Sequence, residues 1–234
     1  MEITPEVTTF SVLVFGFLLG LRHATEADHL AAVSTIVSER KNLFASSIVG
    51  GLWGLGHTIS LFLVALVVIF MKLKISPELE TKLEAIVGGM LILLGLNVLR
   101  KLLQSKKIHV HEHDHGVRPH VHLHVHGEEK AEAPHHGFSP RSVIVGMVHG
   151  LAGSGALMFI ILPLIPSPLI AMLYVLIFGI GSIGGMMAMS FLIGLPFHFT
   201  ANRFEILNKG IRLLAGVFSL GLGSYIVYEK LIAA

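Results

Sequence analysis

The stretch Arg22 to Leu30, which reads RHATEADHL, places two histidines and two carboxylates within seven residues. Imidazole nitrogens combined with carboxylate oxygens form a ligand set that suits Ni²⁺, Co²⁺, Zn²⁺ and Cu²⁺, whereas Mg²⁺ and Ca²⁺ prefer oxygen ligands alone. The alternative is a purely structural role, in which Arg22 and Glu26 form an ion pair at a membrane surface. Which of the two applies depends on where in the protein this cluster lies.

The cluster interrupts what otherwise reads as one membrane span. Residues 10–21 before it and residues 30–37 after it carry no charge. At the centre of a span each Arg or Asp costs about 2.5–3.5 kcal/mol, while each large apolar residue returns only about 0.3–0.6 kcal/mol. These groups therefore need a polar or water-filled interior with partners, and ionisable residues in such a position are functional candidates.

Helical geometry separates one member of the cluster from the others. At about 100° per residue, Arg22, His23, Glu26 and His29 fall within an arc of about 120°, whereas Asp28 lies about 140° from His23. Asp28 therefore cannot join the histidines on a regular helix. Either the long first segment is broken at the cluster, or Asp28 serves another contact.

Two further histidines lie within apolar segments. A single membrane histidine is most often a helix–helix hydrogen bond, but four in one small protein favour a shared site. We predict that they converge near mid-membrane, with Arg22 and Glu26 as outer partners of the ligands. His198, at the end of another segment, is predicted to be interfacial. The predicted metal ligands are His23, Asp28, His29, His57 and His149.

The composition is that of a polytopic membrane protein, because the 234 residues are 53% hydrophobic and only 14% charged. The absence of cysteine excludes disulfides and thiolate metal sites. The N-terminus shows no removable signal peptide. The apolar segments predict an all-α fold with six transmembrane helices, over residues 7–37, 45–71, 83–103, 142–165, 169–197 and 210–228.

The distribution of Lys and Arg predicts the orientation in the membrane. With the N-terminus outside, the inner loops hold twelve basic residues and the outer side four, Arg22 within a span being left out. Short cytoplasmic loops are enriched in Lys and Arg. We therefore predict that both termini lie outside a plasma membrane and that the loop over residues 104–140 is cytoplasmic.

The two halves of the chain show a weak internal repeat. Residues 20–23 (GLRH) align with residues 146–149 (GMVH), so that His149 matches His23. Because three spans is an odd number, equivalent halves must enter the membrane from opposite sides, and such inverted repeats place the substrate site near the midplane. We predict a first three-helix half over residues 1–103 and a second over residues 141–234.

The loop over residues 104–140 separates these halves and is rich in histidine. Two runs of four histidines alternate with other residues at period two. Such tracts bind metal, and a merely solvated linker is the alternative. Its length and composition do not support a folded domain. We predict auxiliary metal binding by His109, His111, His113, His115, His120, His122, His124 and His126.

At this point the motifs resemble a known family. RHATEADHL resembles the H-x4-D-H signature of the nickel/cobalt transporter family, carried here by His23, Asp28 and His29, with Glu26 where the family usually has Asp. Residues 55–60 (LGHTIS) resemble a second family motif, and residues 149–157 (HGLAGSGAL) are similar to the shorter urease-accessory branch. The resemblance covers nearly all the chain except the loop, and it implies a prokaryotic inner-membrane permease for Ni²⁺, with Co²⁺ as the second candidate. In one departure, larger members have acidic residues in the second half where this chain has His149 and neutral neighbours.

The predicted function is uptake of Ni²⁺ or Co²⁺ to supply a metalloenzyme such as urease, with a cytoplasmic nickel chaperone as a candidate partner. No phosphate-binding GxxxxGK[ST] loop is present, and we predict no enzyme activity, no prosthetic group and no nucleic-acid partner. Two alternatives stay open: efflux by proton antiport, and a non-transporting urease-assembly or metal-storage partner. A third is a membrane acyltransferase, whose H-x4-D pattern His23 and Asp28 also match, although the further blocks that bind the acyl acceptor are missing.

Overall fold

The computed structural model describes residues 5–40, 42–72, 76–104, 109–113, 120–124, 140–151, 165, 167–201 and 203–233. These residues form seven helices and one two-stranded antiparallel sheet. The elements are α1 (Pro5–His23), α2 (Ala27–Val37), α3 (Leu43–Met71), α4 (Pro77–Gln104), β1 (His109–His113), β2 (His120–His124), α5 (Pro140–Leu151), α7 (Pro168–Ala201) and α8 (Glu205–Leu231).

The first predicted span is broken at the charged cluster, where α1 and α2 meet at a bend of 55°. The amide and the hydroxyl of Thr25 both donate to the carbonyl oxygen of Arg22, at 2.8 and 2.6 Å. The amide of Glu26 donates to the carbonyl oxygen of His23 at 3.1 Å, and Glu26 has extended backbone angles immediately before α2 begins at Ala27. These i→i+3 bonds tighten the last turn of α1 and stop it. The structure therefore shows the break, which was one of the two alternatives that the sequence left open.

The helices are those of a multi-pass membrane protein. Four of them, α3, α4, α7 and α8, are long and apolar enough to cross a membrane, and the bent α1–α2 pair raises the number to five. The predicted fourth segment is represented by α5, which has 12 residues, while residues 152–164 lie outside the described part. The prediction of six spans is therefore supported for four to five of them.

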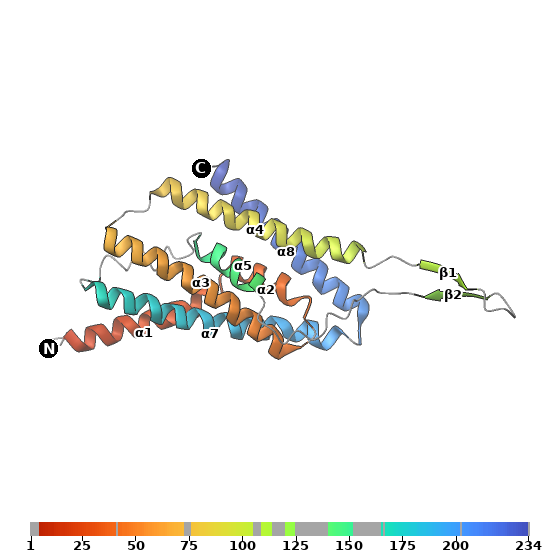
Figure 1. The fold of residues 1–234 in the computed structure, drawn as a ribbon, viewed down its shortest axis with the longest axis horizontal. Coiled ribbons are helices and arrows are strands. Elements are labelled where there is room, and N and C mark those ends of the chain that lie inside the picture. The colour runs from red at the N-terminus through yellow and green to blue at the C-terminus, as the bar shows by residue number, and fades with distance from the viewer. Residues whose placement is uncertain are drawn as a thin grey trace.

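The long helices are arranged in two groups, with the short helices α2 and α5 between them (Figure 1). One group is the pair α4 and α8, which pack along each other. In the other group α7 packs against both α1 and α3, and α3 packs against α5. Helix α2 contacts α4, α7 and α8, so it bridges the two groups. Both termini lie toward one end of the bundle, and the β1–β2 hairpin extends beyond the other end (Figure 1).

Helices α3 and α5 approach each other through glycines. A Cβ atom at Gly146 would overlap the carbonyl oxygen of Trp53, and one at Gly150 would overlap the carbonyl oxygen of His57. Small residues at four-residue spacing allow such backbone contact between membrane helices. The contact holds α5 against α3 at the level of His57, and it thereby fixes the position of His149 between the two glycines.

The His-rich loop contains the hairpin β1–β2, although no secondary structure was predicted there. Alternation of histidine with other residues at period two is typical of a strand, which explains the difference. The register places histidines opposite each other in three pairs: His109 and His124, His111 and His122, and His113 and His120. The predicted loop ligands His115 and His126 lie outside the described residues.

Candidate metal site

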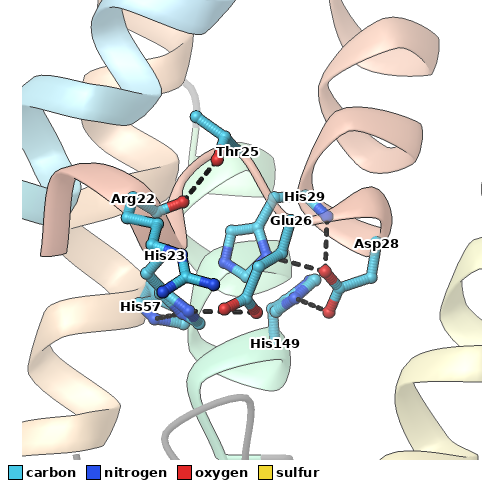
Figure 2. A network of polar contacts seen from close by, with 8 residues as sticks. All are labelled: Arg22, His23, Thr25, Glu26, Asp28, His29, His57 and His149. Atoms are coloured by element: carbon cyan, nitrogen blue, oxygen red, sulfur yellow. Dashed lines mark hydrogen bonds and ion pairs between the residues drawn. The ribbon is translucent and has the colours of Figure 1, made fainter. Parts of the chain in front are cut away.

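Four buried histidines converge inside the bundle, each from a different helix (Figure 2). His23 ends α1 and His29 lies in the first turn of α2. His57 lies in the middle of α3, and His149 lies in the last turn of α5. None of the four is more than 3% exposed. The ring centroid of His29 is 4.3 Å from that of His23 and 4.2 Å from that of His149, and the His23 and His57 centroids are 5.1 Å apart.

Asp28 joins the cluster because the chain bends just before it. One carboxylate oxygen, Oδ1, lies 2.9 Å from Nδ1 of His29 and also accepts the His29 amide at 2.9 Å. The other oxygen, Oδ2, lies 3.0 Å from Nε2 of His149. Both alternatives left open by the helical geometry hold together here: the helix is broken, and Asp28 makes a contact with a distant segment. That contact links the first half of the chain to α5.

A second carboxylate, that of Glu26, contacts His23 at the ring nitrogen that does not face His57. Oε2 of Glu26 is 3.1 Å from Nδ1 of His23, and Nε2 of His23 is 3.1 Å from Nε2 of His57. The Glu26 side chain is 37% exposed, so it lies at the edge of the cluster. The Arg22 side chain is exposed, and its predicted role as an outer partner remains a prediction.

Several polar atoms of the cluster are buried without a hydrogen-bond partner among the described residues. They are Nε2 of His29, Nδ1 of His57 and Nδ1 of His149. Leaving a buried polar group unpaired costs about 1–3 kcal/mol, so such groups call for an explanation. The five residues of the cluster form two possible ligand groups: His23 with His29 and His57, and Asp28 with His29 and His149. In each group the ligand atoms lie within 4.8 Å of one another. Nitrogen donors with one carboxylate fit a divalent transition-metal ion.

Apolar residues surround the cluster. Trp53 on α3 packs against it, with ring centroids 5.2 Å from His29 and 5.4 Å from His149. Phe178 on α7 lies 5.4 Å from His23. Each aromatic residue belongs to a larger buried apolar cluster, the first including Met186 and the second including residues of α3 and α7. An ion that enters this space must therefore exchange its hydration water for the ligands of the cluster.

Sequence reasoning did not identify Trp53 or Phe178 as neighbours of the site. A signal for Trp53 was present, because it precedes His57 by four residues and therefore shares its helix face. Phe178 gave no comparable signal. His198 near the end of α7 is exposed and makes an edge contact with the ring of Phe199, outside the histidine cluster. Met186 of α7 packs in the same buried apolar core as Trp53.

Comparisons with known proteins show the family to which the chain belongs. Residues 9–158 match the NicO family, described as high-affinity nickel-transport protein. The chain is 36% identical over 228 residues to a urease accessory protein, UreH, of Bacillus sp. (strain TB-90), covering 96% of this chain and 93% of that relative. No solved structure matches the chain. The family match and the identity to this relative together show that the chain belongs to the NicO family of nickel-transport proteins.

Proposed function

We propose that this protein is a membrane permease that takes up Ni²⁺, with Co²⁺ as a second substrate, to supply a metalloenzyme such as urease. The observation that carries the proposal is the buried cluster of four imidazoles and Asp28 in a multi-pass helical protein. Membership of a nickel-transport family supports the choice of metal. The printed name of the UreH relative supports urease as the destination of the ion.

The proposed ligands are the five residues that the structure brings together. Nε2 of His29 is buried without a hydrogen-bond partner among the described residues, and the Nε2 atoms of His57 and His149 face His23 and Asp28 within the cluster. His23 and Asp28 complete the set. Imidazole donors favour Ni²⁺ and Co²⁺ over the more abundant Mg²⁺, which requires oxygen ligands. Glu26 acts one step further out, where it orients the His23 ring that it contacts.

The proposed architecture is an inverted repeat with the site between its halves. In this scheme α5, α7 and α8 are the counterparts of the α1–α2 pair, α3 and α4. The observed contacts are consistent with a two-fold exchange: α1·α7 corresponds to α3·α5, while α3·α7 and α4·α8 each correspond to themselves. The Asp28–His149 contact crosses between the halves. Transporters of this class bind substrate at such a junction.

The proposed direction is inward, with both termini outside and the hairpin in the cytoplasm. Inward movement of a divalent ion at −100 mV is favoured by about 4.6 kcal/mol, or about 2.3 kcal/mol per charge. This corresponds to a concentration ratio of more than about a thousandfold. Uptake therefore needs no coupled ion, whereas efflux, the alternative, requires one.

Flux in reconstituted vesicles tests the function and the direction together. Purified protein in vesicles held inside-negative should accumulate radioactive Ni²⁺, and accumulation should collapse when the potential is removed. Excess Co²⁺ should compete and excess Mg²⁺ should not, because the donors are mainly nitrogen. Protein-free vesicles are the control. Absence of flux would favour a non-transporting partner of urease assembly, and flux that requires a proton gradient but no potential would favour antiport.

The hairpin histidines are proposed to be auxiliary. They lie on the β1–β2 hairpin, which extends beyond the end of the helical bundle (Figure 1), whereas the histidines of the cluster are buried among the helices. Replacing the six paired histidines by glutamine should leave transport intact and lower the apparent affinity or the metal tolerance of cells. Uptake measured against external Ni²⁺ concentration checks this. Complete loss of flux in a well-expressed variant would contradict the division between site and loop. The residues replaced are His109, His111, His113, His120, His122 and His124.

A further inference from the structure

The histidine cluster is divided in two by the ring of His29. Nδ1 of His29 faces Asp28, at 2.9 Å from its carboxylate, while Nε2 of the same ring is buried without a hydrogen-bond partner among the described residues. The two nitrogens of an imidazole point away from each other in the ring plane. A metal ion held by Nδ1 and one held by Nε2 would therefore occupy different places.

Each side of the His29 ring has its own set of further donors. On one side are His23 and His57, whose Nε2 atoms lie 3.1 Å apart. On the other side are Asp28 and His149, whose contact is 3.0 Å. The two resulting groups share only His29, and in each the ligand atoms lie within 4.8 Å of one another. The first group contains nitrogen donors alone, and the second contains a carboxylate.

We propose that the cluster provides two alternative positions for the transported ion, one held by His23, His29 and His57 and the other by Asp28, His29 and His149. This inference rests on the proposed function and describes how the same site handles its substrate. One ion occupies the site at a time, because two divalent charges on opposite sides of one imidazole repel strongly in apolar surroundings. His29 belongs to both positions, so the ion stays within reach of its ring during transfer.

The two positions differ in which helices supply them. The ligands of the first come from α1, α2 and α3, all within the first half of the chain. The second position needs His149 from α5 in addition to Asp28 and His29. A movement of one half against the other would therefore assemble or break the second position and leave the first intact. Alternation between outward-open and inward-open states would therefore change which of the two positions holds the ion.

Cobalt absorption spectroscopy can separate two positions from a single shared one. The protein is used at full length, with all ten histidines of residues 104–140, which include His135 and His136, replaced by glutamine so that only the buried cluster binds. Co²⁺ is the probe, because its visible spectrum depends on the number and type of its ligands. His57→Gln should retain only the carboxylate-containing position, and His149→Gln only the all-nitrogen position. His198→Gln, outside the cluster, is the matched control.

Transfer of the ion between the positions requires them to bind with comparable affinity, so the observed association constant is the sum of two similar terms. Either single variant should therefore lose less than about tenfold in Co²⁺ affinity. The two variants should give different spectra, and the wild-type spectrum should be a mixture of both. The double variant His57→Gln/His149→Gln should lose more than about a hundredfold, well beyond the sum of the single effects. Gel filtration and thermal unfolding of each variant in detergent check that it remains folded.

Other outcomes overturn the inference in distinguishable ways. If either single variant loses as much affinity as the double variant, or if both give the same spectrum, all the ligands serve one position. In that case Ni²⁺ flux and binding persist in the wild-type protein, so the proposed function stands. If the wild-type cluster binds neither Co²⁺ nor Ni²⁺, the proposed function itself is wrong, and the two positions are rejected with it.

Discussion

An Asp28→Asn variant is expected to lose metal transport while it still inserts into the membrane. Asp28 is the carboxylate through which α2 contacts His149 of α5, and it is 19% exposed. Asparagine keeps the size of the side chain but removes its charge. An amide NH₂ group, which donates hydrogen bonds, also replaces one of the two oxygens that contact His29 and His149. Asp28 contacts both His29 and His149, so its loss removes the position that joins the two halves, although the position of His23, His29 and His57 can still bind the ion. Even a group that only orients a ligand is worth about 10–100-fold in affinity or activity, so we expect flux to fall at least about tenfold.

Flux of radioactive Ni²⁺ per molecule of reconstituted protein measures this effect. Glu39→Gln is the matched control, because Glu39 forms a peripheral ion pair with Lys101 at 2.7 Å and lies outside the cluster. That pair is partly exposed, and its loss should cost at most about 1 kcal/mol of stability. Near-normal flux in Asp28→Asn together with normal flux in the control would exclude Asp28 from the ion pathway.

A Gly146→Ala variant should lose transport through a change of one methyl group, although Gly146 offers no donor to an ion. The added Cβ would overlap the carbonyl oxygen of Trp53 and lie 2.9 Å from Cδ1 of its ring. Helices α3 and α5 must then separate, and His149, one turn after Gly146, moves away from Asp28. Overpacking of this kind costs about 1–3 kcal/mol of stability. We expect flux below about a tenth of wild type, which corresponds to about 1.4 kcal/mol.

The matched control for this prediction is Gly184→Ala. A Cβ at Gly184 meets nothing within 4 Å, and this glycine also lies within a long membrane helix, α7. Alanine is better than glycine inside a helix by about 0.5–1 kcal/mol, so the control should be as stable as wild type or more so. Thermal unfolding in detergent and Ni²⁺ flux are measured for both variants. Equal behaviour of the two would mean that the contact of α5 with α3 does not set the geometry of the site.

Much of the site can be predicted from the sequence, because placing a polar or charged residue within a membrane span costs so much free energy. His23, Asp28 and His29 stand out as polar residues inside an apolar segment, and His149 stands out through its alignment with His23. The helical geometry also indicates that Asp28 needs a break or a distant partner. What it leaves open is the partner itself. The 55° bend decides that Asp28 reaches His149, and its direction depends on how α2 packs against α4, α7 and α8.

Other features depend on tertiary contacts that a linear pattern does not contain. Trp53 reads from the sequence as an ordinary apolar residue, and only the close approach of α5 places it beside His149. The loop shows the opposite case. Its period-two alternation is a local signal for strands, but the abundance of histidine favours a metal-binding linker instead. Strand pairing then sets His111 opposite His122, a register that the alternation alone does not specify.

The position of Trp53 has a consequence for how the protein can be observed. It is the single tryptophan in the chain, and its ring centroid lies 5.2 Å from that of His29 and 5.4 Å from that of His149. Ions with unpaired d electrons, such as Ni²⁺ and Co²⁺, quench indole fluorescence at this range, whereas Zn²⁺ has a filled d shell and does not. The native protein therefore carries its own optical probe. Its emission would report the arrival of an ion at the cluster in real time, without any label.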